Sequence, residues 1–272
     1  LDKAETQLQL EQLGMDSRSL KQFESSLKSP NGIILVTGPT GSGKTTTLYA
    51  GLNILNDKTK NILTVEDPIE YAIEGVTQTQ VNTKVGMTFA KGLRAILRQD
   101  PDIIMLGEIR DLETAEIAIQ ASLTGHLVLS TVHTNDSVAA ITRMIDIGIE
   151  SYLLASTLKA VLAQRLVRKL CSSCKESLSL DSTIGTLNKG TKVFKAKGCD
   201  SCNNTGYQGR VGIFELFLIT DEIKEAINAG ETESRLSNLA FSNENKLSHS
   251  GYDLVLKGET SLEEILRVTS EK

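Results

Sequence analysis

A glycine-rich segment follows a short apolar run in the first quarter of the sequence. The apolar run is Ile33–Val36, and the segment after it is Gly38-Pro-Thr-Gly-Ser-Gly-Lys44-Thr45. The spacing G-x-x-x-x-G-K-[ST], between an expected strand and an expected helix, indicates a loop that binds phosphate groups. Glycines let the backbone turn its N–H groups toward phosphate oxygens, and the positive end of the helix dipole lies beside them.

This loop defines the first set of candidate binding residues. We expect Lys44 to reach the β- and γ-phosphates of a nucleotide and the Thr45 hydroxyl to be a ligand of Mg²⁺. The candidate nucleotide-binding residues are Gly38, Thr40, Gly41, Ser42, Gly43, Lys44, Thr45 and Thr46. The alternative is a chance glycine-rich turn, and the flanking strand and helix argue against it.

A carboxylate follows another expected strand. Ile103–Leu106 is a short apolar run, and Gly107 and Glu108 come directly after it. An acid at this position orients or activates the attacking water in phosphate-transferring enzymes and supports Mg²⁺ binding. Glu108 is therefore the candidate catalytic acid. The alternative is an acid at the start of the next helix, because Asp111 and Glu113 follow closely.

Two further groups of polar side chains adjoin expected strands. Glu66, Asp67 and Glu70 follow Ile62–Val65, and water polarisation, a Mg²⁺-supporting contact and a solvated turn all stay open for this cluster. His126 and His133 bracket the strand Leu127–Thr131. His133 lies at its carboxyl end, where a hydrogen bond to the γ-phosphate is possible, whereas His126 lies at the opposite end. A structural role stays open for both histidines.

Arginines near these segments are candidate cations for the γ-phosphate. Arg94 and Arg98 are four residues apart on an expected helix, and Arg110 follows Glu108 by two positions. Arginines on helix surfaces are usually solvated, so the sequence leaves both roles open.

The cysteines form two close pairs. The pairs are Cys171-Ser-Ser-Cys174 and Cys199-Asp-Ser-Cys202. Two C-x₂-C pairs supply the four thiolates of a closed tetrahedral site, so we expect structural Zn²⁺ with no open position for catalysis. Two redox-active pairs are the alternative. So few cysteines in 272 residues argue against a disulfide-stapled secreted scaffold and favour a reducing cytoplasm.

Alternating strands and helices must position these groups. Short apolar runs at Ile33–Thr37, Ile62–Val65, Ile103–Leu106 and Leu127–Thr131 predict buried strands, and helical spacing separates them at Lys44–Asn56, Phe89–Arg98, Glu113–Leu123 and Ser137–Ile147. This α/β order predicts a parallel sheet covered on both faces, with ligands at the carboxyl ends of its strands. Tyr152–Leu166 is a further expected helix, because leucines recur every four residues. Asp221–Asn228 and Ser261–Val268 are expected to belong to a helical tail.

The predicted organisation has four parts. They are an N-terminal remnant or linker (1–30), an ATPase core (31–166), a tetracysteine metal-binding module (167–212) and a C-terminal helical subdomain (213–272). Acidic residues exceed basic ones by 34 to 29, which gives a net charge of −5, and aromatic residues make up only 4%. Both numbers argue against nucleic acid as a partner. The longest uncharged run, Ile117–Asn135, is too polar for a membrane span.

Several motifs together resemble the secretion ATPases of bacterial type II secretion and type IV pilus assembly. Beside the glycine-rich loop, they are Thr64-Val-Glu-Asp-Pro-Ile-Glu70, Arg98-Gln-Asp-Pro-Asp102 with Leu106-Gly-Glu108-Ile-Arg-Asp111, and Gly125-His126 with Thr131-Val-His133-Thr-Asn135. Val76–Asn82 and Met87–Arg98 look most like the type II secretion member. Pilus extension ATPases carry a similar four-cysteine module and are the alternative.

The resemblance implies a RecA-like P-loop NTPase core that works as a hexameric ring at the cytoplasmic face of the inner membrane. Such motors hydrolyse MgATP and drive a pseudopilus for protein export, through inner-membrane platform and cytoplasmic docking proteins. By matching motif, Lys44 and Thr45 carry over as nucleotide and Mg²⁺ ligands, and Glu108 as the catalytic acid. Glu66, in the Thr64–Glu70 motif, carries over as a supporting acid. His133, in the Thr131–Asn135 motif, carries over as a contact of the nucleotide site, and the four cysteines carry over as zinc ligands.

The resemblance covers the chain from about Leu13 to its end. Family members carry further N-terminal domains that dock the motor and supply arginines, and we expect residues 1–12 to be the remnant of that region. The chain is therefore expected to bind nucleotide and to hydrolyse it poorly. A nucleic-acid translocase, a zinc-dependent scaffold and a small-molecule kinase are the competing functions.

Overall fold

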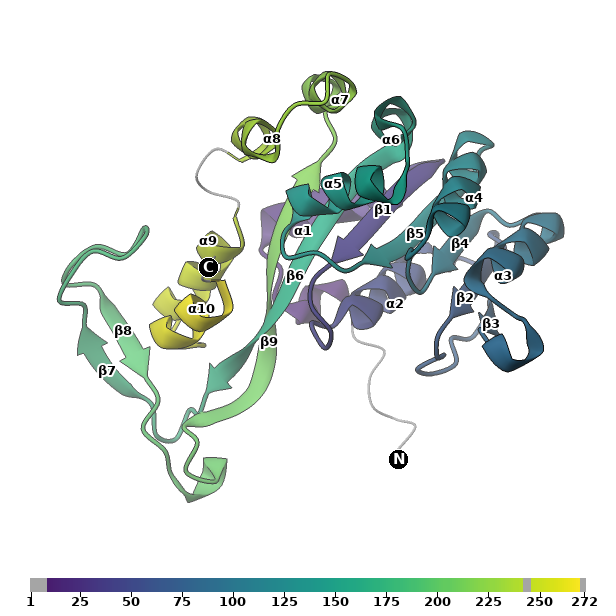
Figure 1. Cartoon of the computed structure of the whole chain (residues 1–272). Helices are drawn as coiled ribbons and strands as arrows, with labels where there is room; N and C mark the ends of the chain where they lie inside the picture. The colour runs from purple at the N-terminus through teal and green to yellow at the C-terminus, as the bar shows by residue number, and fades with distance from the viewer. Residues whose placement is uncertain (1–8, 242–245, 270–272) are drawn as a thin grey trace.

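The computed structural model describes residues 9–241 and 246–269 (Figure 1). Within these residues, seven strands form one sheet in the order β3-β2-β4-β5-β1-β6-β9. Their bounds are β1 (Gly32–Thr37), β2 (Ile62–Glu66), β3 (Val76–Gln80), β4 (Ile103–Leu106), β5 (Leu127–Val132), β6 (Leu158–Leu170) and β9 (Tyr207–Leu218). All neighbouring strands pair in parallel except β6 and β9, which are antiparallel.

The helices pack on both faces of this sheet. Their bounds are α1 (Ser17–Leu27), α2 (Lys44–Leu55), α3 (Phe89–Ile96), α4 (Leu112–Leu123), α5 (Ser137–Ile147), α6 (Ser151–Thr157), α7 (Asp221–Asn228), α8 (Glu233–Ala240), α9 (Leu247–Leu256) and α10 (Leu262–Thr269), with short 3-10 turns at Leu10–Leu13, Thr83–Val85, Leu97–Gln99 and Asp200–Cys202. No helix in the described ranges has the length and apolar character to cross a membrane. The parallel-rich α/β sheet predicted from the sequence is confirmed.

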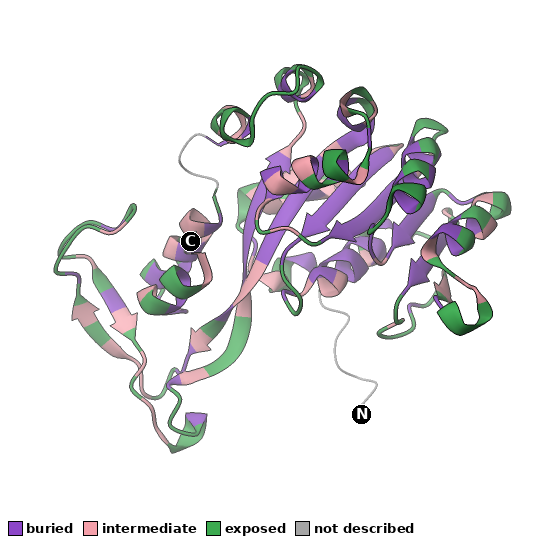
Figure 2. Ribbon diagram, in the orientation of Figure 1, coloured by how far each residue is buried: buried purple, intermediate pink, exposed green. Residues whose placement is uncertain are grey.

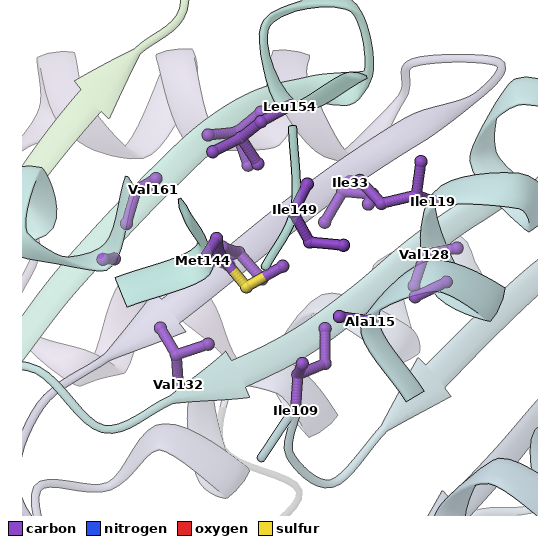
Figure 3. Close-up of a cluster of buried hydrophobic side chains, with 14 of the residues drawn as sticks. Ile33, Ile109, Ala115, Ile119, Val128, Val132, Met144, Ile149, Leu154 and Val161 are labelled. Carbon is purple, nitrogen blue, oxygen red and sulfur yellow. The ribbon is translucent and has the colours of Figure 1, made fainter. Parts of the chain in front are cut away.

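Two hydrophobic cores hold the sheet between its helices. One joins the sheet to α3 through α8, and Figure 3 shows part of it, with Met144 of α5 and Leu154 of α6 near Ile33 of β1. The other joins the opposite face to α1 and α2. Strands β1, β4 and β5 are buried along their whole length (Figure 2), as expected for strands covered on both faces. The four predicted strands and the helices between them are found within a few residues of their expected bounds.

The helix predicted over Tyr152–Leu166 is wrong. Helix α6 ends at Thr157, Leu158 takes extended backbone angles, and the chain continues as the long strand β6. Strand β1 pairs with the first part of β6, Leu158–Ala163, and β9 pairs with β6 from Ala160 to Leu170. This pairing satisfies backbone N–H and C=O groups of β6 without a helix.

A smaller group of elements packs against the C-terminal half of β6. The hairpin β7 (Glu176–Ser179) and β8 (Lys192–Lys195) forms a two-stranded sheet, and α9 and α10 lie between it and the β6–β9 ribbon (Figure 1). A third hydrophobic cluster joins these elements. The sequence predicts α7 and α10 within one residue. Strands β6 and β9 run across positions 166 and 212, and the predicted four-part division stays a prediction; residues 1–8 of its first part lie outside the described residues.

Candidate functional site

The glycine-rich loop lies between the end of β1 and the start of α2. Gly41 and Gly43 have φ angles of 77° and 86°, in the left-handed region that favours glycine. Helix α2 begins at Lys44 with no side-chain cap, so the N–H groups of its first turn are not covered by a capping side chain. A cavity of about 600 Å³ opens beside this loop.

The walls of this cavity come from several strand ends. The loop and α2 contribute Thr40, Gly41, Gly43, Lys44, Thr45 and Thr46. The carboxyl ends of β2, β4 and β5 contribute Glu66, Glu108 and His133, so the structure brings the candidate catalytic residues to the predicted edge of the sheet. Ser42 is buried in the loop but does not line the cavity, and neither does Gly38.

The Lys44 ammonium group is folded against its own loop. Its Nζ donates hydrogen bonds to the carbonyl oxygens of Gly38, at 2.9 Å, and Pro39, at 3.0 Å. Burial lowers the pKa of Lys44 below its ordinary value, and the charge of Glu108 acts in the opposite direction. A polyanion in the cavity would offer this ammonium group stronger acceptors than the two carbonyl oxygens.

Glu108 has a cation on one side and a histidine on the other. Its Oε1 pairs with the guanidinium of Arg110, and its Oε2 lies 3.3 Å from Nε2 of His133. The Glu108 residue is 8% exposed, and its Oε2 has no hydrogen-bond partner among the described residues. The hydrogen bond to Glu108 raises the pKa of Arg110, so this guanidinium stays charged beside the carboxylate. Glu108 therefore lies at the cavity with one carboxylate oxygen paired to Arg110 and the other beside His133.

Glu66 is held by three donors. Its Oε1 accepts hydrogen bonds from Thr64, at 2.6 Å, and Gln78, at 3.0 Å, and its Oε2 accepts one from the Tyr49 hydroxyl. Burial raises the pKa of Tyr49, and the hydrogen bond to Glu66 adds to that effect. Since Glu66 is only 1% exposed and its oxygens are engaged, the geometry favours a supporting role over proton transfer.

The remaining sequence candidates lie elsewhere. Nδ1 of His126 donates to the Ala121 carbonyl at 2.8 Å, at the end of β5 away from the cavity. Arg94 forms an exposed ion pair with Glu113 at 2.7 Å. Neither of these residues lines the cavity, and the same is true of Arg98.

Sequence analysis missed several residues of this site. Leu166 of β6 and Arg210 of β9 line the cavity, and Tyr49 of α2 reaches Glu66. Gln164 of β6 is 2% exposed, and its amide donates a hydrogen bond to the Ser42 carbonyl oxygen in the loop. One sequence signal could have pointed to Gln164. It is the polar pair Gln164–Arg165, which interrupts the apolar segment that was predicted to be a helix.

The four cysteine sulfurs come together as predicted. All four Sγ atoms lie within 4.8 Å of one another, with separations of 3.9 Å for Cys171–Cys199, 3.8 Å for Cys174–Cys202 and 3.7 Å for Cys199–Cys202. Four thiolates about 2.3 Å from a tetrahedral zinc ion would be roughly 3.8 Å apart. The set therefore fits a four-coordinate metal, and no open position is left for a substrate.

Backbone donors add to this cluster. The N–H groups of Cys199 and Gly206 each lie 3.2 Å from the Cys202 sulfur. Burial raises the pKa of the Cys202 thiol, but these donors outweigh it and hold the pKa at about 6. Thiolates bind metals, so these backbone donors favour the ligating form of Cys202.

Comparison with known proteins gives a consistent result. The family described as type II/IV secretion system protein matches residues 1–267. Type II secretion system protein E of Aeromonas hydrophila is 56% identical over 279 residues, and type II secretion system ATPase E of Vibrio cholerae is 55% identical over 276 residues. Each alignment covers 100% of this chain and 55% of the relative, so the chain spans about half the length of these relatives.

Solved structures share the fold. The crystal structure of the pilus retraction motor PilT with bound ADP is 30% identical, with a TM-score of 0.74, over 97% of this chain and 67% of that one. The Legionella pneumophila ATPase DotB, at 21% identity and a TM-score of 0.70, covers 96% of this chain and 65% of its own and supports the fold alone. Because the family match spans nearly the whole sequence, the chain belongs to the type II/IV secretion system protein family.

Proposed function

We propose that this chain is the ATP-hydrolysing part of a motor that powers pseudopilus assembly and protein export in type II secretion. The observation that carries the proposal is that the phosphate-binding loop, Glu108 and His133 line the same cavity. The names of two curated relatives at 55–56% identity favour type II secretion over pilus extension. The ADP in the related motor PilT supports a nucleotide as the ligand.

The proposed reaction uses the residues around the cavity. Lys44 and the loop N–H groups bind the phosphates, and the oxygen of a water molecule attacks the γ-phosphorus. The bond from that phosphorus to the bridging oxygen breaks, so that ADP and phosphate leave, while Glu108 accepts the proton of the water. His133 orients this carboxylate or contacts the γ-phosphate. Glu66 fixes the strand end beside them.

Mg²⁺ and Zn²⁺ complete the proposal. Thr45 lines the cavity next to Lys44, which supports its hydroxyl as a Mg²⁺ ligand. This ion would neutralise charge on the β- and γ-phosphate oxygens. Cys171, Cys174, Cys199 and Cys202 would hold one structural Zn²⁺, because their sulfur spacing fits it. That ion would fix the polar segment after β6 without entering the reaction.

The assembly is part of the same proposal. We infer that the chain acts within a hexameric ring on the cytoplasmic side of the inner membrane, through platform and docking proteins and without nucleic acid. The chain spans 55% of the length of the Aeromonas hydrophila relative, and we propose that most of these contacts involve the part of such relatives outside the match. Activity of the chain alone is then expected to be low.

Steady-state ATP hydrolysis over a wide protein-concentration series tests the proposal. Turnover per subunit is expected to rise with concentration and to vanish in Glu108→Gln and Lys44→Ala. Turnover near that of a longer chain with its N-terminal domains would contradict the expected low activity. Turnover that survives both substitutions would contradict the proposed site.

A further inference from the structure

Gln164 lies behind the phosphate-binding loop on strand β6. Its Nε2 donates a hydrogen bond to the carbonyl oxygen of Ser42 at 2.8 Å, and its Oε1 accepts one from the Thr47 hydroxyl at 2.6 Å. The Ser42 carbonyl can only accept, so the amide must present its NH₂ group to the loop and its oxygen to α2. Both ends of one buried side chain are therefore engaged with the nucleotide-binding segment.

The hydrogen bond to Ser42 orients the next peptide N–H group. In a trans peptide the C=O and N–H groups point in opposite directions, so the N–H that follows the Ser42 carbonyl belongs to Gly43 and points away from Gln164. Gly43 lines the cavity, whereas Gln164 does not. Holding the carbonyl back on the strand side thus turns the Gly43 N–H toward the cavity, where a phosphate oxygen would accept from it.

Two glycines allow the loop to pack closely on this strand. A Cβ atom added at Gly43 would lie 2.8 Å from Nε2 of Gln164, and one added at Gly38 would lie 2.3 Å from the Gln164 carbonyl oxygen. At this point β6 is paired with β9, where Gln164 is opposite Phe214. The loop therefore packs against a paired strand of the sheet and is hydrogen-bonded to it.

We propose that Gln164 is a positioning residue of the nucleotide site. It holds the Ser42 carbonyl, and through Thr47 the first turn of α2, so that the loop N–H groups are oriented before a nucleotide arrives. The inference deepens the proposed function and rests on it. Preorganised donors lower the cost of ordering the loop on binding, so losing them weakens nucleotide affinity.

Binding of a fluorescent ADP analogue in the presence of Mg²⁺ tests this role. Gln164→Glu keeps the acceptor for Thr47 but places a carboxylate oxygen against the Ser42 carbonyl, and Gln164→Met keeps the approximate volume without either hydrogen bond. Both are expected to weaken ADP binding by about tenfold to a hundredfold, as expected for a buried hydrogen bond lost with one partner left unsatisfied. Gln120→Glu, the same chemical change at an exposed position of α4, should leave affinity within about twofold of the wild type.

Two further variants separate positioning from general loss of stability. Ile227→Ala removes a buried side chain in α7, far along the chain from the loop, and should lower the melting temperature without a matching loss of affinity. Thr47→Val removes the bond to Oε1 and keeps the bond to Ser42, so it should weaken ADP binding by only a few-fold. It also provides the test if the Gln164 variants do not fold.

Each outcome separates this inference from the proposed function. Wild-type affinity in folded Gln164→Glu and Gln164→Met, or in Thr47→Val if those two do not fold, would overturn the positioning role and leave the proposed function standing. Equal affinity losses in Gln164→Met and a stability-matched Ile227→Ala would also overturn it. A wild-type chain that binds no ADP would overturn the proposed function, and the inference with it.

Discussion

Nε2 of His133 lies 3.3 Å from Oε2 of Glu108, although 25 positions separate them in the sequence. The pairing of β4 with β5 creates this contact, because Leu106 is opposite Ser130 and both residues follow soon after these strands. The histidine therefore faces the carboxylate oxygen that lacks a hydrogen-bond partner in the described structure. The order of strands in the sheet thus places His133 beside the proposed catalytic acid.

Replacing Glu108 by Gln should separate binding from hydrolysis. The amide keeps the size of the side chain but cannot accept the proton of the attacking water, so we expect turnover to fall by about a hundredfold or more. ADP affinity should stay within about threefold of the wild type, since the loop and Lys44 are unchanged. Single-turnover hydrolysis and ADP titration measure the two effects. Full activity in the variant would exclude Glu108 as the base.

The two histidines that bracket β5 form a matched pair. His133→Ala removes the imidazole that lies 3.3 Å from the Glu108 carboxylate and is expected to reduce turnover about tenfold, the effect of losing one polar contact that orients the catalytic acid. His126→Ala removes a side chain bonded to the Ala121 carbonyl, away from the cavity, and should change turnover by less than about twofold. The kcat values of both variants check this. Equal losses would show that the contact with Glu108 is not the cause.

The cysteine cluster should hold one metal ion per chain, and removing it should destabilise the protein. Cys174→Ser breaks the four-sulfur set and is expected to release zinc and lower the melting temperature by about 5 °C or more. ADP affinity should be unchanged, because the closed set leaves no open position for a ligand. Elemental analysis and thermal unfolding, with Ser173→Ala as the control, measure this. A wild-type chain that is equally stable with and without bound metal would contradict the zinc proposal.

The buried carboxylate of Glu264 predicts a pH-dependent stability. Burial raises its pKa, but hydrogen bonds from Arg267 and Arg168 outweigh this and bring the pKa to about 2, below the ordinary 4.5. A carboxyl group with a lowered folded-state pKa contributes stability above about pH 4.5 that is lost as the pH falls toward 2. Glu264→Gln should therefore cost about 1.5–3 kcal/mol at pH 7, the range for hydrogen bonds to a charged group.

Denaturant unfolding at a series of pH values checks this prediction. The difference between the wild type and Glu264→Gln should shrink as the pH falls below 4.5, where the wild-type carboxylate also loses its advantage. Glu263→Gln, a neighbouring change at an exposed position, should show no such trend. A pH-independent difference would mean that the two arginines do not stabilise the ionised form.

Much of the fold could be predicted because its central strands are short and continuously apolar. Strand β6 could not, because its leucines recur every four residues, and an interval of four is one helical turn as well as two strand repeats. Leu158 and Leu162 lie on one face of an extended chain as readily as on one face of a helix. Only Val161 and Val167, with branched side chains, favoured the strand.

The same error concealed part of the site. Loop, acid and histidine could be predicted because each adjoins a strand whose carboxyl end faces the ligand edge. Gln164 and Arg210 carry no local motif, and they reach the site only because β6 lies beside β1 and β9 lies beside β6. Long-range pairing of this kind is a property of the tertiary structure and leaves little trace in the spacing of residues.

Two helical glycines give a final prediction about packing. A Cβ added at Gly92 of α3 would lie 2.8 Å from Cγ1 of Val65 on β2, whereas one added at Gly51 of α2 would lie 3.4 Å from Leu27, an ordinary contact. Gly92→Ala should therefore lower the free energy of unfolding by about 1–3 kcal/mol through overpacking. Gly51→Ala should be neutral or stabilising by up to about 1 kcal/mol, because alanine favours the helix. Chemical denaturation of both variants measures the difference, and a stabilising Gly92→Ala would show that α3 does not pack this closely on the strand that carries Glu66.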